Sequence, residues 1–198
     1  MDKMIRKAEI SRQTGETDVR VSLRLDGAGE YTLDTGIPFF EHMLALLAKF
    51  GQFDLDVHAR GDLEVDAHHT VEDVGICLGE ALARALGEKE GIRRFGHAVI
   101  PMDEALALVA VDLSGRGYLA FEASLPAPRV GRFDTELVVE FLRALAHNGR
   151  FNLHVRMLAG SNTHHMIEAI FKGLGVALGQ AVGVNAYQGV PSTKGVIN

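Results

Sequence analysis

The chain carries one segment twice, and this internal repeat limits the folds open to it more than any other feature. Residues 42–57 align without a gap on residues 140–155. In each copy, apolar residues at helical spacing run up to a glycine, and alternating apolar residues follow. This pattern predicts an amphipathic helix, a glycine stop and a strand. The matching pairs include Leu44/Leu142, Leu47/Leu145, Ala48/Ala146, Gly51/Gly149, Phe53/Phe151, Leu55/Leu153 and Val57/Val155.

A second repeated motif follows each of these segments. His68-His69-Thr-Val-Glu72 matches His164-His165-Met-Ile-Glu168, and a helical pattern continues to about residue 86 in one copy and 182 in the other. We therefore predict two copies of one unit, residues 1–95 and residues 96–198, the second with a C-terminal tail. Because the apolar stripes of all the helices must be buried, we expect one integrated domain.

The remaining segments favour an α+β fold. Residues 19–34 alternate around a glycine turn and predict a hairpin, and residues 105–113 and 118–123 predict a matching pair around 114–117. The economical packing places the four helices of both halves together in one layer, with a β-sheet on each outer side. Residues 125–132 and the tail 189–198 read as irregular.

Composition narrows the function classes. The net charge of −6 argues against nucleic acid as the main partner. No apolar run reaches the ~18 residues of a membrane span, and the first residues lack the apolar stretch of a signal peptide. We therefore expect a cytoplasmic protein without a membrane partner. The single cysteine, Cys77, cannot form an intrachain disulfide and reads as a small buried apolar residue.

The paired histidines predict a metal centre. Neighbouring residues on a helix point about 100° apart, so the two imidazoles of a pair address different metals. The glutamate three or four positions later shares their helix face. His42 and Glu140 occupy equivalent repeat positions and complete a set of eight donors, enough for two metals. The predicted ligands are His42, His68, His69, Glu72, Glu140, His164, His165 and Glu168.

Mixed imidazole and carboxylate donors suit octahedral Mn or Fe(II) better than a closed zinc site. Pseudo-symmetry suggests one way of dividing the donors between the two metals. One metal would take His42, His69, Glu72 and His165, and the other would take His68, Glu140, His164 and Glu168.

At these residues the chain resembles the imidazoleglycerol-phosphate dehydratase family of histidine biosynthesis. The matching segments follow in family order over essentially the whole chain. They are Thr14-Gly-Glu-Thr17, Gly36-Ile-Pro-Phe-Phe-Glu-His-Met-Leu44, Asp66-Ala-His-His-Thr-Val-Glu-Asp73, Gly91-Ile-Arg-Arg-Phe-Gly96, Pro101-Met-Asp-Glu-Ala105, Asp112-Leu-Ser-Gly-Arg116, residues 158–172 and Pro191-Ser-Thr-Lys-Gly195.

The resemblance implies two sheets around a four-helix layer, two Mn²⁺ per active site, and a 24-subunit shell of trimers with metal sites between subunits. Many family members carry His where this chain has Glu140. The implied reaction, catalysed by a hydro-lyase, is loss of water from imidazoleglycerol phosphate to give imidazole acetol phosphate. The departing proton sits on a carbon without an adjacent carbonyl, and metals on the ring nitrogens would make the imidazole ring the electron sink.

The resemblance also assigns roles at the substrate. Glu16 is the candidate proton shuttle. Glu168 is a second candidate for proton transfer, but its role as a metal ligand would compete with this one. Arg94, Arg116, Ser192 and Lys194 match positions that hold the substrate phosphate. Gln52, beside the helix stop after His42, is a weaker candidate for substrate contact.

Two other functions account for part of the pattern. A dinuclear hydrolase of phosphate esters would use the same metals and basic residues, but it leaves the tail motif and the ordered segments unexplained. A ferritin-like storage protein would place Glu-x-x-His on four long helices, whereas here the order is reversed and strands intervene.

Overall fold

The computed structural model describes residues 6–184 and 189–197. The first half contains strands β1, β2, β3 and β4 and helices α1 and α2. Their bounds are β1 Lys7–Gln13, β2 Thr17–Arg24, β3 Tyr31–Asp34, α1 Pro38–Gly51, β4 Asp54–Gly61 and α2 His68–Leu86.

The second half repeats this order with a short insertion. Its elements are β5 Phe95–Met102, β6 Ala105–Asp112, β7 Tyr118–Glu122, β8 Arg129–Val130, β9 Phe133–Asp134, α3 Leu137–Asn148, β10 Asn152–Ala159 and α4 Thr163–Val182. The insertion is the two-stranded β8–β9 ribbon, which begins within residues 125–132, the segment expected to be irregular, and ends just beyond it. Division into repeat units 1–95 and 96–198 stays a prediction.

The strands form one four-stranded sheet per half, with orders β1-β2-β4-β3 and β5-β6-β10-β7. In each sheet the last strand of the half enters between earlier strands. β4 pairs antiparallel with β2 and parallel with β3, and β10 pairs in the same two ways with β6 and β7.

The two predicted hairpins are therefore wrong in their pairing. β2 pairs with β1, and β6 pairs with β5, in antiparallel register. Residues 7–13 and 95–102 had not been recognised as strands, although they supply these partners. In each half, the two strands expected to pair are separated by another strand. β4 lies between β2 and β3, and β10 lies between β6 and β7.

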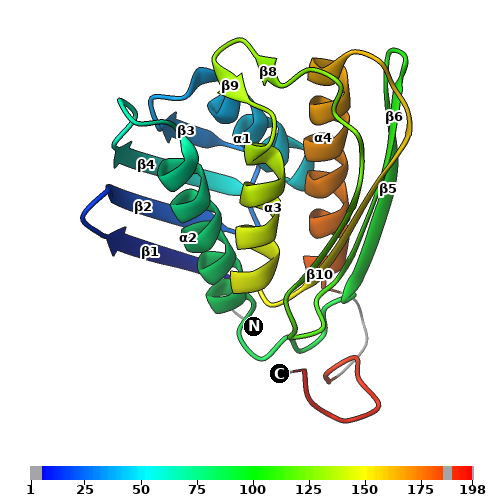
Figure 1. Ribbon diagram of the computed structural model, residues 1–198. Coiled ribbons are helices and arrows are strands. Elements are labelled where there is room, and N and C mark those ends of the chain that lie inside the picture. Colours follow the sequence, from blue (N-terminus) through cyan, green and yellow to red (C-terminus); the bar gives the residue numbers. More distant parts are fainter. Residues whose placement is uncertain (1–5, 185–188, 198) are drawn as a thin grey trace.

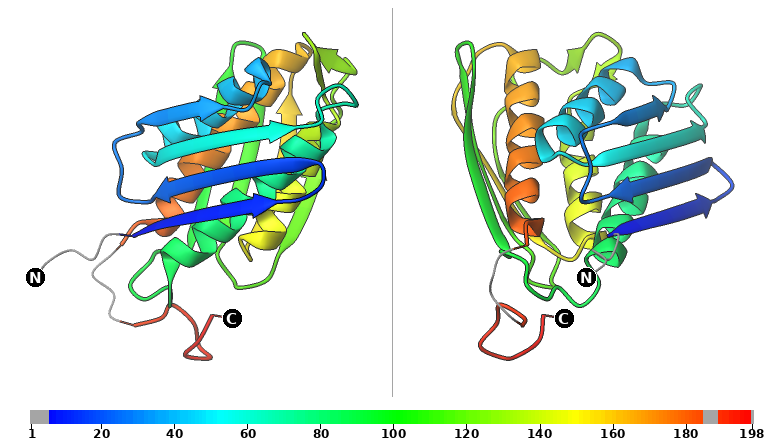
Figure 2. Two further views of the ribbon diagram at one scale, coloured as in Figure 1. Left: turned by 90° about the vertical axis from the view of Figure 1, so that its left-hand side faces the viewer. Right: turned by 180° about the vertical axis from the view of Figure 1, so that it is seen from behind.

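The four main helices lie between the two sheets, as predicted (Figures 1 and 2). α2 packs on β1 and β2, and α4 packs on β5 and β6. Strands β2 and β6 bury alternate residues against this layer, as half-buried strands do. The core is built on five fully buried phenylalanines, Phe40, Phe53, Phe141, Phe151 and Phe171.

Helices from different halves pack together, and glycines bring them close. α1 contacts α4, and α2 contacts α3. A Cβ on Gly175 would lie 2.9 Å from the backbone N of Gly51, and one on Gly79 would lie 2.7 Å from that of Gly149. Both contacts leave no room for a larger side chain. These contacts between helices of different halves bring residues of the first half beside residues of the second.

Candidate metal centre

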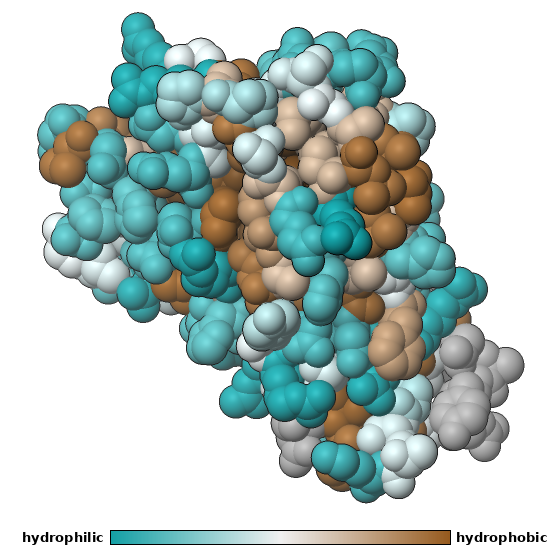
Figure 3. Space-filling view, turned by 45° about the vertical axis from the view of Figure 1, so that its right-hand side comes forward, coloured by the Kyte–Doolittle hydropathy of each residue, from teal (hydrophilic) through white to brown (hydrophobic). Residues whose placement is uncertain are grey.

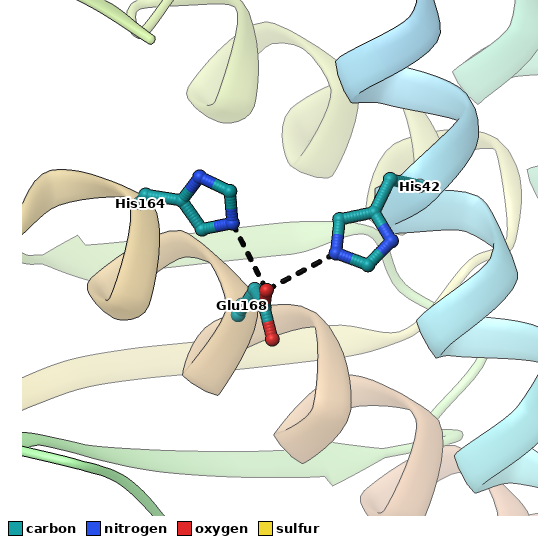
Figure 4. A group of neighbouring side chains, drawn as sticks. All are labelled: His42, His164 and Glu168. Atoms are coloured by element: carbon teal, nitrogen blue, oxygen red, sulfur yellow. Dashed lines mark hydrogen bonds and ion pairs between the residues drawn. The ribbon is translucent and has the colours of Figure 1, made fainter.

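Three predicted ligands converge between α1 and α4. His42 Nε2 lies 3.1 Å from Glu168 Oε1, and His164 Nε2 lies 3.0 Å from the same oxygen. One donor atom from each residue falls within 4.8 Å of the other two. Figure 4 shows both imidazoles directed at the carboxylate. Within residues 6–184 and 189–197, this is the only group of three or more such side chains that converges so closely.

Local sequence fixes the start of the helix that carries His42. Pro38 occupies the first turn of α1, where its missing N–H costs nothing. Glu41 Oε1 accepts hydrogen bonds from the backbone N–H groups of Thr35 and Gly36 and from the Thr35 hydroxyl. These contacts set where the helix begins and therefore which way His42 points.

The start of α4 is capped by Asn162. Its side-chain oxygen accepts from the backbone N–H groups of His164 and His165, at 2.9 and 3.4 Å. This contact satisfies two of the free donors at the helix start. In the first half, Asp66 Oδ1 accepts from the backbone N–H of His68 at 2.7 Å. Both histidine pairs are therefore anchored through their own backbone.

Glu168 is almost buried yet ionised. Its residue is 8% exposed. Burial alone raises the pKa of this carboxyl, but hydrogen bonds from Lys172, His42 and His164 outweigh burial and bring it to about 2. Lys172 Nζ lies 2.6 Å from Glu168 Oε2, one turn further along α4. Sequence analysis missed Lys172, although its i,i+4 spacing from Glu168 is a usable signal.

The second histidine of each pair turns away from the first. The ring planes of His68 and His69 lie at 85°, and those of His164 and His165 lie at 82°. His69 Nδ1 lies 3.0 Å from Asp62 Oδ2, and His165 Nδ1 lies 2.8 Å from Glu104 Oε2. Sequence analysis also missed these two carboxylates, because no repeated spacing links them to the histidines.

Hydrogen bonds to these carboxylates raise the pKa of both histidines above the ordinary value. Glu104 Oε1 also accepts from the backbone N–H groups of Asn162 and Ser161, at 2.7 and 3.2 Å. The hydrogen bond with His165 and these two backbone contacts hold the pKa of Glu104 at about 2.

Glu16 lies exposed on the β1–β2 turn, with Oε2 3.7 Å from His69 Nε2. The turn is tied to α2 by Asp73, whose residue is 7% exposed. Asp73 accepts from the Thr17 hydroxyl and, at 2.8 Å, from Arg12 Nε. Glu16 is therefore placed beside a histidine pair by a buried carboxylate that sequence analysis did not single out.

The predicted division of ligands between two metals is wrong for His42. Within one chain, the structure groups His42 with His164 and Glu168 of α4, and not with His69 and Glu72 of α2, because α1 packs against α4. His165 is also on α4, but its ring faces Glu104. Except for His165, which is on α4, the other predicted ligands lie on the α2–α3 pair. His68 and Glu72 are on α2, and Glu140 is on α3, where it forms an ion pair of 2.5 Å with Arg143.

The predicted anion-binding residues meet elsewhere. Arg94, Arg116, Ser192 and Lys194 line one cavity of about 180 Å³, together with Ser114 and Thr193. Arg94 is oriented by Asp112, at 2.7 and 3.2 Å, and by the carbonyl of Pro191 at 2.9 Å. Gln52 does not line this cavity. It ends α1 in a left-handed conformation and lines a separate hollow with Arg93 and Gln180.

The cavity and the histidine cluster lie at opposite ends of α4. The backbone N–H of Arg94 donates to the carbonyl of Ala181, near the C-terminal end of the helix, whereas His164 is in its first turn. At 1.5 Å per residue, the 17 steps along the helix from residue 164 to residue 181 span roughly 26 Å. A small substrate cannot touch both regions of one chain.

None of the helices in the described part of the chain is both long and apolar enough to cross a bilayer.

Comparison with known proteins points to one family. The family model described as imidazoleglycerol-phosphate dehydratase matches residues 35–178.

Two relatives, both named imidazoleglycerol-phosphate dehydratase, match almost end to end. The one from Desulforudis audaxviator (strain MP104C) is 76% identical over 98% of this chain and 100% of its own length. The one from Pelotomaculum thermopropionicum is 61% identical over 93% of this chain and 95% of its own. The crystal structure of imidazoleglycerol-phosphate dehydratase from Staphylococcus aureus subsp. aureus N315 superposes with a TM-score of 0.83, at 41% identity, covering 90% of this chain and 99% of that one.

Proposed function

Since this chain belongs to the imidazoleglycerol-phosphate dehydratase family, we propose that it removes water from imidazoleglycerol phosphate at a centre holding two Mn²⁺. The product is imidazole acetol phosphate, an intermediate of histidine biosynthesis. The protein is a hydro-lyase, and the finer assignment concerns its metals, its site residues and its assembly.

The observation that carries the metal assignment is the group formed by His42, His164 and Glu168. Two imidazoles and one ionised carboxylate, each with a donor atom within 4.8 Å of the others, fit a divalent cation. The low pKa of Glu168 favours a ligand role over the proton-transfer role suggested by sequence, since a carboxylate with a pKa of about 2 is a weak base. Both of its oxygens also have partners already.

Pseudo-symmetry supports a second group of three donors. His68 and Glu72 on α2 correspond to His164 and Glu168 on α4, and Glu140 corresponds to His42 in the aligned repeat. The α2–α3 pair also corresponds to the α1–α4 pair. We assign His68, Glu72 and Glu140 to the second metal. His69 and His165, turned away from these groups, supply the remaining donors to centres of neighbouring copies.

The metals, when bound, act as Lewis acids on the ring nitrogens and the departing hydroxyl. The remaining work falls to side chains of this chain. Glu16 moves the carbon-bound proton, because its carboxylate lies exposed beside His69 and is free to reach a substrate. Asp73 keeps the turn that carries Glu16 against α2.

The substrate phosphate is held by Arg94, Arg116, Ser192 and Lys194. Support comes from the cavity they share and from the way Asp112 presents the Arg94 guanidinium. A planar guanidinium and an ammonium group provide charge-assisted hydrogen bonds to phosphate oxygens. Gln52 stays a weaker candidate for substrate contact, from a neighbouring hollow.

The distance between the cavity and the cluster supports a site assembled from more than one copy. The substrate is far shorter than the roughly 26 Å that separate the two regions. Exposed apolar side chains on the second sheet offer a surface for self-association, and Figure 3 shows apolar areas on that side of the molecule. They include Phe95, Val99, Tyr118 and Leu158. We propose a 24-subunit shell built from trimers, located in the cytoplasm.

The test is a product assay on protein first freed of metal and then loaded with Mn²⁺. Imidazoleglycerol phosphate should yield the ketone product only after loading. Release of inorganic phosphate instead would identify a hydrolase, and rapid iron oxidation without substrate would identify a storage protein. Full activity in the metal-free protein would refute the metal-dependent mechanism.

A further inference from the structure

Each half of the chain places a carboxylate against the same nitrogen of its second paired histidine. Asp62 Oδ2 and Oδ1 lie 3.0 and 3.2 Å from His69 Nδ1. Glu104 Oε2 lies 2.8 Å from His165 Nδ1. Among the described residues, the carboxylates nearest to the other ring nitrogens lie farther away. His69 Nε2 is 3.7 Å from Glu16, and His165 Nε2 is 3.8 Å from Asp103.

The two carboxylates come from non-equivalent places in the repeat. Asp62 directly follows β4, and continuing the gapless alignment of 42–57 on 140–155 would place Gly160 at its position in the second half. Glu104 lies instead on the turn between β5 and β6. The repeat therefore did not simply copy this contact. Both halves reach the same geometry with different residues, which points to a requirement at the histidine itself.

An ionised carboxylate can only accept a hydrogen bond, so it fixes the ring hydrogen on Nδ1. The lone pair then remains on Nε2, the atom a metal can bind. We propose that Asp62 and Glu104 are positioning residues that keep Nδ1 of His69 and His165 as a hydrogen-bond donor and so reserve Nε2 of each ring for a metal ion. This inference rests on the proposed function. In this proposal, neither carboxylate binds the metal or the substrate directly.

The two carboxylates should respond differently to loss of charge, because they are held differently. In the described part of the chain, the Asp62 side chain has hydrogen bonds to His69 alone. The amide introduced by Asp62→Asn can therefore turn its oxygen toward Nδ1 and keep the ring hydrogen there. Asp62→Ala removes the acceptor altogether.

Glu104 lacks this freedom. Its Oε1 accepts from the backbone N–H groups of Ser161 and Asn162, and Oε2 faces His165. The amide introduced by Glu104→Gln must keep its oxygen on the two backbone donors, so its NH₂ group faces Nδ1. Nδ1 then becomes an acceptor and the ring hydrogen moves to Nε2, which blocks metal binding.

The experiment titrates metal-free assembled protein with Mn²⁺ and follows free Mn²⁺ by electron paramagnetic resonance. We expect Glu104→Gln and Asp62→Ala each to weaken one class of Mn²⁺ site, roughly 10- to 100-fold, as loss of a ligand's hydrogen-bond partner does elsewhere. Asp62→Asn should stay close to the wild type. The matched control is Asp56→Ala, which removes an exposed carboxylate 3.2 Å from His58 Nε2 on β4 and should leave Mn²⁺ binding unchanged.

A double variant separates positioning from a general structural effect. In the His165→Ala background, Glu104→Gln should cause no further loss of Mn²⁺ affinity, because the ring it positions is gone. Wild-type affinity in both Glu104→Gln and Asp62→Ala, or an undiminished loss in the His165→Ala background, overturns this inference alone. Absence of Mn²⁺ binding by the wild-type protein overturns the proposed function as well.

Discussion

Lys172 Nζ lies 2.6 Å from Glu168 Oε2, the carboxylate oxygen that His42 and His164 leave free. The side chains of Lys172 and Glu168 are only 15% and 10% exposed. Both carboxylate oxygens are thus occupied, one by a cation and one by two imidazoles. The first half has no such arrangement, because the residue one turn after Glu72 is Ile76. The two proposed metal groups therefore differ in charge.

Lys172→Met should destabilise the metal-free protein more than the Mn²⁺-loaded protein. It leaves Glu168 ionised and nearly buried without its cation, at a cost of about 1–3 kcal/mol, below the range for fully buried pairs because some exposure remains. A bound Mn²⁺ supplies the missing positive charge. Thermal unfolding with and without Mn²⁺ measures the difference.

The control for Lys172→Met is Arg20→Met, which breaks an exposed ion pair with Glu9. It should change the free energy of unfolding little in either metal state, as exposed pairs do. An equal loss of stability with and without Mn²⁺ in Lys172→Met would show that Glu168 does not face the metal.

His164→Ala should lose one equivalent of Mn²⁺ per chain together with dehydratase activity. The substitution removes one of the two imidazoles that converge on Glu168. Elemental analysis after dialysis measures the metal. His154→Ala, on an exposed position of β10, is the matched control and should keep both metals. Full metal content in His164→Ala would contradict the assignment.

The sequence pattern predicted the fold of two sheets around four helices and the three residues of the His42, His164 and Glu168 group. It did not predict which strands pair or which ligands group together. Helical spacing and glycine stops predicted α1 and α3, and the repeated motif marked the start of α2 and α4. Strand neighbours were missed because β4 and β10 insert between strands that are adjacent in sequence. Insertion of this kind depends on long-range packing, which local alternation does not record.

The grouping of ligands failed for a similar reason. Pseudo-symmetry restricts the possible groups, but whether His42 meets donors from α2 or from α4 depends on which helices touch. That choice follows from the close approach of Gly51 and Gly175, a contact between the halves. The roles of Asp62 and Glu104 were hidden as well, since each meets its histidine only after folding.

Asp73→Asn should lower both the stability of the protein and its turnover. Asp73 has 9% side-chain exposure and binds Arg12 and the Thr17 hydroxyl. An amide has one accepting oxygen, so its NH₂ group must face either the Arg12 guanidinium, which cannot accept, or the Thr17 hydroxyl, which must then turn to accept. With the negative charge lost as well, this should cost about 1–3 kcal/mol. Because Thr17 adjoins the turn of Glu16, we expect kcat to fall more than KM rises.

The matched variant for Asp73→Asn is Thr17→Ser, which keeps the hydroxyl that donates to Asp73. It should retain most of the activity and stability. Denaturant unfolding and steady-state kinetics provide both readouts. If Asp73→Asn lost stability but kept the wild-type kcat, Asp73 would be structural only, without influence on Glu16.

Lys194→Ala should raise KM for the phosphorylated substrate about tenfold, the effect of losing one charge-assisted hydrogen bond. Lys194 lines the cavity shared with Arg94 and Arg116, far from the histidine cluster. Metal content should therefore stay at the wild-type value. Lys7→Ala, on the exposed side of β1, is the control. An unchanged KM would remove Lys194 from the substrate site.

Cys77 should resist thiol reagents in the folded protein and stabilise the fold less as the pH rises. The residue is fully buried in α2, and burial, with Glu80 and Asp73 nearby, raises the pKa of its thiol from 9.0 to about 12. At pH 8 the thiolate fraction is roughly 10⁻⁴, against about 10⁻¹ for an unfolded chain. A chromogenic disulfide reagent should thus react only after denaturation.

The same pKa shift sets the sign of the pH dependence. The unfolded thiol ionises near pH 9, whereas the folded thiol stays neutral until about pH 12. The contribution of Cys77 is therefore fully present below pH 9 and is lost as the pH rises from 9 to 12. Cys77→Val removes the ionisable group, so the free energy of unfolding of the wild type should fall relative to this variant across that window. Parallel pH profiles of the two proteins would mean that the thiol is accessible to water in the folded state.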